Sequence, residues 1–275
     1  MELLYILLAP GFWTLFMHIT KYEKREKMIN IKLTIEYEGT KYHGWQRQKN
    51  YLSIQEILEE KIFQITKERI NLIGSGRTDA GVHALGQVAN FKTNSSIPWT
   101  RLPLILNVLL PLDIRIRKAE MVDDNFHARY SAISKIYHYY ILNYPKNNYY
   151  LPIFLRNYVY CVYKKINLEE IRKASNFLRG EHDFSSFACS GSRIKNSVRN
   201  IKEITITKKG SIICFHLEAN AFLYKMVRTM IGTLLEVGSG KKSYLEIKKI
   251  LEAEDRKVAG KPVPAKGLFL MKVNY

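Results

Sequence analysis

The sequence predicts an α+β protein made of two similar α/β halves whose sheets are mixed and largely antiparallel. The first observation is the order of elements, because each half reads strand, helix, two strands, helix, strand. The second is that two strands follow each other across the short turn "KKGS", and such hairpins build antiparallel sheets. The two halves are not visibly alike in sequence, so duplication is only a hypothesis.

In the first half, the opening element is a half-buried strand over residues 31–37, where apolar and polar residues alternate. Ser53 and Glu56 then form a capping-box pattern at the start of a helix over residues 53–66. The half continues with a strand over 87–91, a short helix over 100–110 with Pro103 in its first turn, and a strand over 114–122.

In the second half, Asn167 is expected to cap a helix over residues 168–179, which Gly180 ends. A long helix is predicted from Ala221 to Val237, and Phe222 is interpreted as part of its packed core. The remaining elements are strands over 135–143, 201–207, 212–219 and 268–273, and a helix over 243–253 with a second capping box, Ser243 and Glu246.

The domain organisation follows from this order: an N-terminal extension, residues 1–27, then one half over 28–134 and one over 135–275. The extension is apolar, but Pro10 and Gly11 interrupt it, so its uninterrupted length is short for a membrane span. It also lacks the positive start and the cleavage site of a secretory signal. We interpret it as a non-native or alternative start, and we expect a chain that begins at Met28 to fold and act.

The composition bounds the class of protein. With 275 residues, 47% of them hydrophobic, the chain can build a substantial core. Lys and Arg number 43 against 25 acids, an excess that fits a nucleic acid partner, although an AT-rich genome also raises lysine content. The cysteines Cys161, Cys189 and Cys214 are far apart and form no C-x-x-C, which argues against a disulfide framework or a structural zinc site and favours a reducing compartment.

The stretch "GSGRTDAGVHALGQVANF" is the strongest local signal. It is neither a Walker A loop, since Val82 stands where Lys is needed, nor a dinucleotide fingerprint, since Asp79 stands where the third glycine belongs. Its glycines could instead expose Asp79 in a cleft, with Arg77 pairing with it or with another acid and favouring the charged form. An ionised Asp in a partly dry site is a competent nucleophile. Spacing alone favours the alternative, a turn Asp that caps its own backbone.

This loop is one of an ordered series of segments. The others are "YEGTKYHGWQRQ", "FHARYSAISKIYHYYILN", "HDFSSFA", "SVRNI", "NAFLYKMVRTMIGTLLEVGSG" and "GLFL". Together they resemble the tRNA pseudouridine synthase A family from about Met28 to Tyr275, and a match of several segments in order is highly specific.

The resemblance implies the pseudouridine synthase fold and a set of site residues. These are catalytic Asp79, Arg77 and Arg228, and substrate-binding Tyr137, Arg199 and Leu268. Since Asp79 and Arg228 belong to different halves, we infer a central basic cleft between the halves.

The resemblance further implies an isomerase that converts uridine to pseudouridine at positions 38, 39 and 40 in the anticodon arm of tRNA. Family members are homodimers, and the reaction needs no metal, nucleotide or other cofactor; we expect a cytoplasmic protein with no membrane partner. The N1 glycosidic bond breaks, the uracil rotates and C5 bonds to the ribose, so the base must leave its stack. Asp79 could attack C1′, attack C6, or remove a ribose proton to give a glycal-type intermediate.

Tyr137 has two candidate roles in this chemistry. It could stack on the flipped base or act as a general base for the C5 proton, and a usual tyrosine pKa near 10 favours stacking.

Three alternative functions were weighed. A non-catalytic RNA-binding protein would lose Asp79 or its arginine, and both are present. A phosphate-binding enzyme is disfavoured by Val82 and Asp79 in the glycine loop. A related synthase acting at another RNA site is not separated from the first hypothesis by the sequence.

Overall fold

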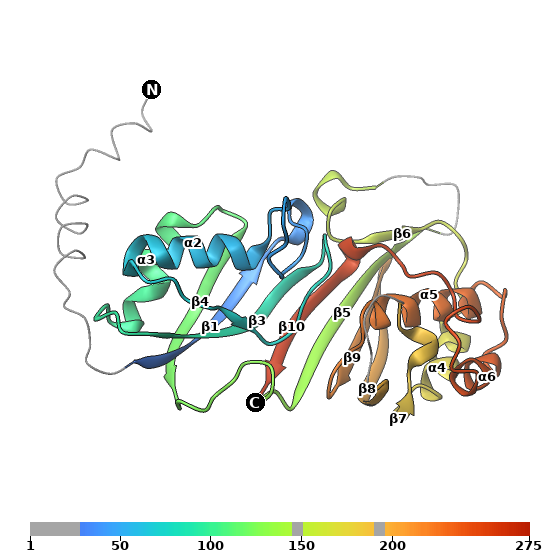
Figure 1. Ribbon diagram of the computed structural model, residues 1–275. Helices are drawn as coiled ribbons and strands as arrows, with labels where there is room; N and C mark the ends of the chain where they lie inside the picture. Colours follow the sequence, from blue (N-terminus) through green and yellow to red (C-terminus); the bar gives the residue numbers. More distant parts are fainter. Residues whose placement is uncertain (1–27, 145–150, 190–195) are drawn as a thin grey trace.

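The strands of the protein form one continuous mixed sheet, seen in a computed structural model that describes residues 28–144, 151–189 and 196–275 (Figure 1). The strand order is β4-β1-β3-β10-β5-β9-β8-β7, with β2 beside β3 and β6 beside β5. The strands are β1 (Ile29–Tyr37), β2 (Ile73–Gly74), β3 (His83–Thr93), β4 (Ile114–Val122), β5 (Ser134–Asn143), β6 (Tyr160–Val162), β7 (Gly180–Asp183), β8 (Val198–Lys209), β9 (Ile212–Ala219) and β10 (Leu268–Asn274).

The helices lie beside the strands of their own half. In Figure 1, α2 and α3 accompany the N-terminal strands, and α4, α5 and α6 accompany the C-terminal strands. Their bounds are α2 (Ile54–Thr66), α3 (Leu102–Leu109), α4 (Leu168–Asn176), α5 (Met226–Gly238) and α6 (Glu246–Glu252). None of the helices in the described part of the chain is both long and apolar enough to cross a membrane.

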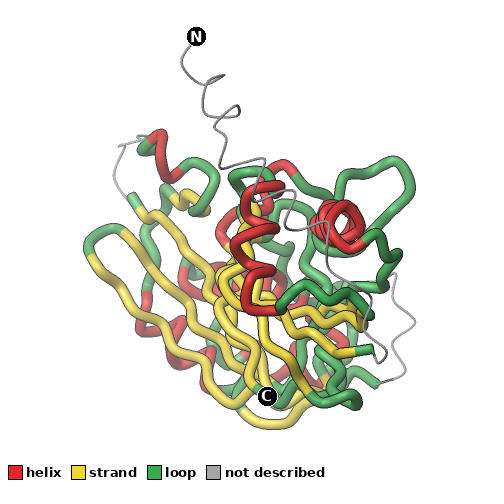
Figure 2. Tube along the Cα trace, turned by 90° about the vertical axis from the view of Figure 1, so that its left-hand side faces the viewer, coloured by secondary structure: helices red, strands yellow, loops and turns green. Residues whose placement is uncertain are grey.

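The predicted α+β class with a largely antiparallel mixed sheet is confirmed. Among the described strands, only β10–β3 and β5–β6 pair in parallel. The side view of Figure 2 shows the strands as a single twisted layer. The structure adds one feature that the sequence did not indicate: β10 lies between β3 and β5, so the last strand of the second half joins the sheet of the first.

Most predicted elements occur where the sequence placed them, and the local signals explain why. Ser53 caps α2, its side chain accepting a hydrogen bond from the Glu56 backbone N–H at 3.4 Å. Asn167 caps α4 in the same way, and Pro103 falls in the first turn of α3. The second capping box is only half present: the Glu246 carboxylate accepts from the Ser243 backbone N–H at 2.6 Å, but the Ser243 hydroxyl accepts from Leu245, and α6 begins at Glu246 rather than at residue 243 as predicted.

The predicted helix over residues 221–237 is wrong at its start. Helix α5 begins at Met226, because Lys225 adopts a left-handed conformation with φ of 58° that no α-helix can include. The preceding turn is fixed by the Asn220 side chain, which accepts from the backbone N–H of Ala221 at 2.8 Å. Phe222 therefore lies in a loop and not in the helix, although its partly buried ring packs against the core as expected.

Alternation along the central strands divides the sheet into two faces. The register pairs Ala84 with Leu270 and Leu270 with Tyr137, so these three side chains share one face, here called the site face. The neighbouring pairs place Phe269 and His138 on the opposite face. The site face carries the buried core of the central strands. Residues 1–27 and most of the loop expected over 144–150 lie outside the described residues.

Candidate active site

The glycine loop connects β2 to β3 and is closed by its own hydrogen bonds. The Val82 backbone N–H donates to the Asp79 carbonyl at 3.1 Å, and the Ser75 hydroxyl donates to the Gln87 side chain at 2.7 Å. Gly81 has φ of 77°, a conformation that glycine adopts without strain. Asp79 thus occupies a tight turn whose backbone shape is set by neighbours on both sides.

The loop packs against the end of β1 and the segment that follows it, through Tyr37 and Trp45. The Trp45 backbone N–H donates to the Thr78 carbonyl at 3.1 Å, and the Tyr37 and Thr78 hydroxyls are 2.8 Å apart. A Cβ added to Gly44 would lie 2.3 Å from the Thr78 carbonyl oxygen, so only glycine allows this approach. Burial raises the pKa of Tyr37 to about 12, and its hydroxyl therefore stays neutral beside Thr78.

Asp79 meets an arginine from the other half of the chain. The Arg228 Nη1 lies 2.8 Å from the Asp79 Oδ2, and the two side chains are only 14% and 18% exposed. Arg228 projects from the first turn of α5, and its Nε donates to the Val263 carbonyl at 2.8 Å. The Asp79 Oδ1 has no hydrogen-bond partner in the described part of the chain. A charge-assisted bond thus fixes the carboxylate and leaves one oxygen available.

Tyr137 lies on β5 beside this pair and is 7% exposed. Its ring packs edge-on against Phe222 with centroids 5.1 Å apart. Burial raises the pKa of the Tyr137 hydroxyl, and the neighbouring Tyr37 and the charge of Asp79 raise it further. A phenol with a raised pKa is a poor proton acceptor at neutral pH, so this environment favours the stacking role over the general-base role.

Arg77 is not in contact with Asp79. It is exposed, and its Nε donates to the Gln46 side-chain oxygen at 3.1 Å. The ion pair that Asp79 makes within the described residues is with Arg228. The structure therefore brings Asp79 and Arg228 together and leaves Arg77 outside that pair, where no step of its own can be assigned from geometry.

The last two residues of the predicted site, Leu268 and Arg199, lie outside the Asp79–Arg228 ion pair. Leu268 begins β10, is buried and pairs in register with Tyr139 of β5. Arg199 lies near the start of β8, where its Nη1 donates to the carbonyls of Asn196 and Val198. Neither residue contacts Asp79 or Arg228 among the described residues.

Sequence reasoning missed the groups that hold the ion pair. The Val263 carbonyl fixes Arg228, and the neighbouring Pro264 carbonyl accepts from the Tyr139 hydroxyl at 2.8 Å. Backbone carbonyls carry no sequence signal, although the prolines of "KPVPAKG" indicate an extended segment able to present them. The Tyr37–Thr78 contact was likewise invisible, because it joins residues 41 positions apart.

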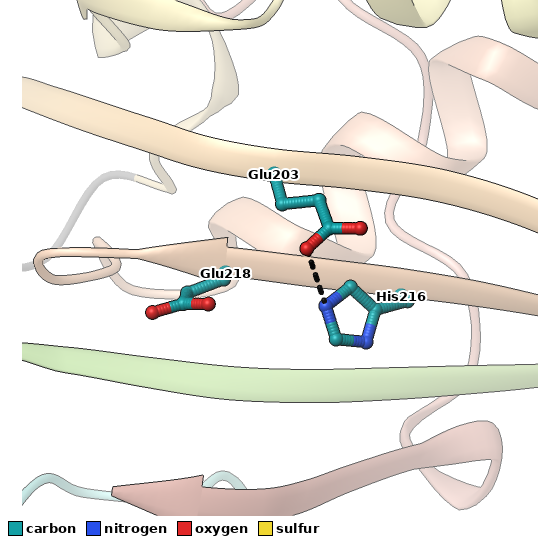
Figure 3. Close-up of side chains that lie close together, drawn as sticks. All are labelled: Glu203, His216 and Glu218. Atoms are coloured by element: carbon teal, nitrogen blue, oxygen red, sulfur yellow. Dashed lines mark ion pairs between the residues drawn. The ribbon is translucent and has the colours of Figure 1, made fainter. Parts of the chain in front are cut away.

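One cluster with metal-ligating side chains lies on the opposite face of the sheet. The donor atoms of Glu203, His216 and Glu218 lie within 4.8 Å of one another (Figure 3). His216 Nε2 is 3.6 Å from the Glu203 carboxylate, and Glu218 accepts a hydrogen bond from the Ser134 hydroxyl at 2.5 Å. We assign no metal to this cluster.

The sequence model of the family described as "tRNA pseudouridine synthase" matches residues 33–131 and 174–275. The chain belongs to the tRNA pseudouridine synthase family. The matched ranges contain Asp79, Arg77, Arg199, Arg228 and Leu268, whereas Tyr137 lies between them.

Two similar family members are both named "tRNA pseudouridine synthase A". The protein from Thermoanaerobacter sp. (strain X514) is 48% identical over 248 residues, which are 90% of this chain and 100% of that protein. The protein from Clostridium kluyveri is 50% identical with the same coverage. A chain of the solved structure "Crystal Structure of a Cbf5-Nop10-Gar1 Complex" matches with a TM-score of 0.35 and 13% identity over 94% of this chain and 50% of that chain, too weak a likeness to carry an argument.

For a member of this family, the geometry around Asp79 offers defined chemistry. The carboxylate is held in a largely dry setting by one cation, which bonds one of its oxygens and leaves the second able to attack an electrophilic carbon. The buried ring of Tyr137 is near enough to Asp79 for the carboxylate charge to act on it, and with the half-buried ring of Phe222 it provides an apolar surface for a base. Such a site could hold a base out of its stack while a carboxylate acts on the nucleoside.

Proposed function

We propose that this isomerase, which by its family converts uridine to pseudouridine in tRNA, acts at positions 38, 39 and 40 of the anticodon arm with Asp79 as the nucleophile. The observation that carries the proposal is the 2.8 Å pair between Asp79 and Arg228, which are 149 positions apart in the sequence. The pair joins a glycine-rich turn of one half to the first turn of a helix in the other half.

The remaining roles extend this proposal. Arg228 orients Asp79, Tyr137 stacks on the flipped base, and Leu268 lines the apolar part of the base pocket. Arg77 and Arg199 contact the RNA. The exposed position of Arg77 supports an RNA contact better than a role in the chemical step.

The proposal also covers the organisation of the protein. Residues 28–134 and 135–275 form the two walls of the cleft, two copies of the chain form a homodimer, and the enzyme works in the cytoplasm. The net charge of +18 supports a substrate recognised through its shape and its phosphates.

The decisive experiment measures tritium release from tRNA labelled at C5 of uridine. We expect release by the unaltered protein and none by Asp79→Asn, whose uncharged amide cannot attack, while tRNA binding is largely retained. Release by Asp79→Asn at a comparable rate would refute the nucleophile assignment.

The target positions need a separate substrate series. A tRNA transcript with uridine only at position 38, 39 or 40 should be modified, and a transcript with cytidine at all three should not. Modification of the latter would place the target elsewhere and favour a synthase of another RNA site.

A further inference from the structure

Lys135 is a half-buried cation on the site face that the roles above do not use. It lies on β5 two residues before Tyr137, and therefore projects to the same face of the sheet. A Cβ built on Gly76 would lie 3.3 Å from the Lys135 Nζ, so the ammonium group sits directly against the glycine loop that carries Asp79. Because Gly76 has no side chain, the ammonium group of Lys135 can lie close to the backbone of the loop.

No acid balances this charge. Within the described residues, Lys135 makes no hydrogen bond and has no carboxylate within ion-pair distance. Arg129, from the loop before β5, and Arg199, from β8, are near enough to act on it. Burial and these two cations lower the pKa of Lys135 to about 8. Two arginines thus lie close enough to Lys135 for their charges to act on it, and the acid that acts on one of them, within the described residues, is Asp183, beside Arg199.

Arg199 is also incompletely satisfied. Its Nε is buried and has no hydrogen-bond partner in the described part of the chain. The nearby acid, Asp183, does not fill the gap, because its oxygens accept from Ser185 and Ser197 and not from the Arg199 Nε. An unpaired buried donor beside an unpaired ammonium destabilises the free protein, and an incoming anion would relieve both.

We propose that Lys135, Arg199 and Arg129 form a binding site for one backbone phosphate of the RNA, next to the nucleotide on which Asp79 acts. The proposal rests on the function proposed above and adds a positioning contact to it. Gly76 is three residues from Asp79, so a phosphate at Lys135 would fix the RNA chain beside the carboxylate. Phosphate contacts of this kind set register and orientation without reading a base.

The test measures equilibrium tRNA binding over a series of salt concentrations at pH 7, in an Asp79→Asn background that blocks turnover. Lys135→Met should weaken binding about tenfold, and the slope of log affinity against log salt should shrink by about one unit, as for one lost phosphate contact. Lys135→Arg should keep affinity within about threefold. Lys248→Met is the matched control, because Lys248 is exposed on α6 and already paired with Glu252.

A fold control separates a binding role from a structural one. If Lys135 serves the RNA, removing its unbalanced charge should leave the midpoint of thermal unfolding unchanged or higher. A lower midpoint in both Lys135→Met and Lys135→Arg would mean that Lys135 is structural and would overturn the proposal. So would an unchanged affinity and salt slope in Lys135→Met, or, in protein that keeps Asp79, a loss confined to kcat, which would indicate a role in the chemical step.

A pH series adds a signature that only this lysine should give. The groups facing Lys135 are Arg129 and Arg199, which stay charged throughout, so between pH 7 and 9 only the ammonium changes. The protein that keeps Lys135 should bind tRNA less tightly as the pH rises above about 8, because the ammonium loses its charge. The Lys135→Arg variant should keep its affinity for tRNA over the same range. Identical pH profiles would contradict the proposal. If the unaltered protein makes no pseudouridine, the proposed function fails, while the salt slope with tRNA still reports on the phosphate site.

Discussion

The two walls of the candidate site hold their charged groups by different means. On the N-terminal wall, Asp79 is placed by backbone shape: Gly44 lets the loop approach closely, and Gly81 provides the turn. On the C-terminal wall, Arg228 is placed by a side-chain bond to Val263 and by its position on α5, whose inner residues are fully buried.

This difference determines how each wall should respond to change. A side-chain atom added to Gly44 would clash with the backbone of the glycine loop and displace the loop. Arg228 would lose its position if its hydrogen-bond donors were removed. Substitutions at the two walls should therefore separate effects on stability from effects on the chemical step.

The largest effect on activity apart from loss of Asp79 is expected at Arg228. Arg228→Gln removes the charge that orients Asp79 and leaves a mostly buried carboxylate without a partner, so kcat should fall by about 10²–10³. Arg228→Lys keeps the charge but cannot bond Asp79 and Val263 together, and should lose less. Single-turnover rates on tRNA measure both.

A double variant then tests whether the two groups act as a unit. Combining Arg228→Gln with Asp79→Asn should lower the free energy of unfolding by less than the sum of the two single losses, because each single change already breaks the same ion pair. Losses that add would show that the two groups do not act as a unit.

The next effect concerns the fit of the loop. Gly44→Ala places a Cβ within 2.3 Å of the Thr78 carbonyl at a position with φ of 86°, so unfolding free energy should fall by about 3 kcal/mol. Gly210→Ala is the control, since its φ of 58° is also left-handed but no atom lies within 4 Å, and it should cost about 1 kcal/mol. If denaturant unfolding gave the same loss of unfolding free energy for Gly44→Ala and Gly210→Ala, the cost would come from backbone strain at the substituted residue and not from the contact with Thr78.

The smallest effect is expected at Arg77. Because this side chain is exposed and bonded to Gln46, Arg77→Gln should leave kcat within about threefold and raise KM for tRNA several-fold. Gln46→Ala frees Arg77 and also removes the hydrogen bond that Gln46 Nε2 donates to Gln55 Oε1 at 2.6 Å, and it should change neither constant. A fall in kcat as large as that of Arg228→Gln would place Arg77 in the chemical step and remove the contrast between the walls.

Local signals in the sequence predicted most elements, and long-range pairing explains what they could not. Ser53 and Asn167 marked helix starts because a cap acts on its own neighbours. The start of α5 was placed too early, because apolar periodicity continues through a turn that Asn220 and Lys225 impose. No local pattern could place β10 between β3 and β5.

The candidate site shows the same limit. Spacing around Asp79 left a capping turn as the favoured interpretation, and only the ordered resemblance singled out Arg228 and Tyr137. The Asp79–Arg228 and Arg77–Gln46 contacts join residues far apart in the sequence, so they follow from the tertiary structure and not from local sequence. The sequence suggested Asp79 as a partner of Arg77, whereas in the structure Arg77 donates a hydrogen bond to Gln46.

The position of β10 has a consequence for how the protein is made. During synthesis, the N-terminal strands leave the ribosome long before β10, so the edge of β3 that β10 later covers stays open for most of translation. Neither half can complete its sheet until residues 268–274 have emerged. The nascent chain thus passes through a long interval with an unpaired strand edge, and truncation before β10 would prolong that interval indefinitely.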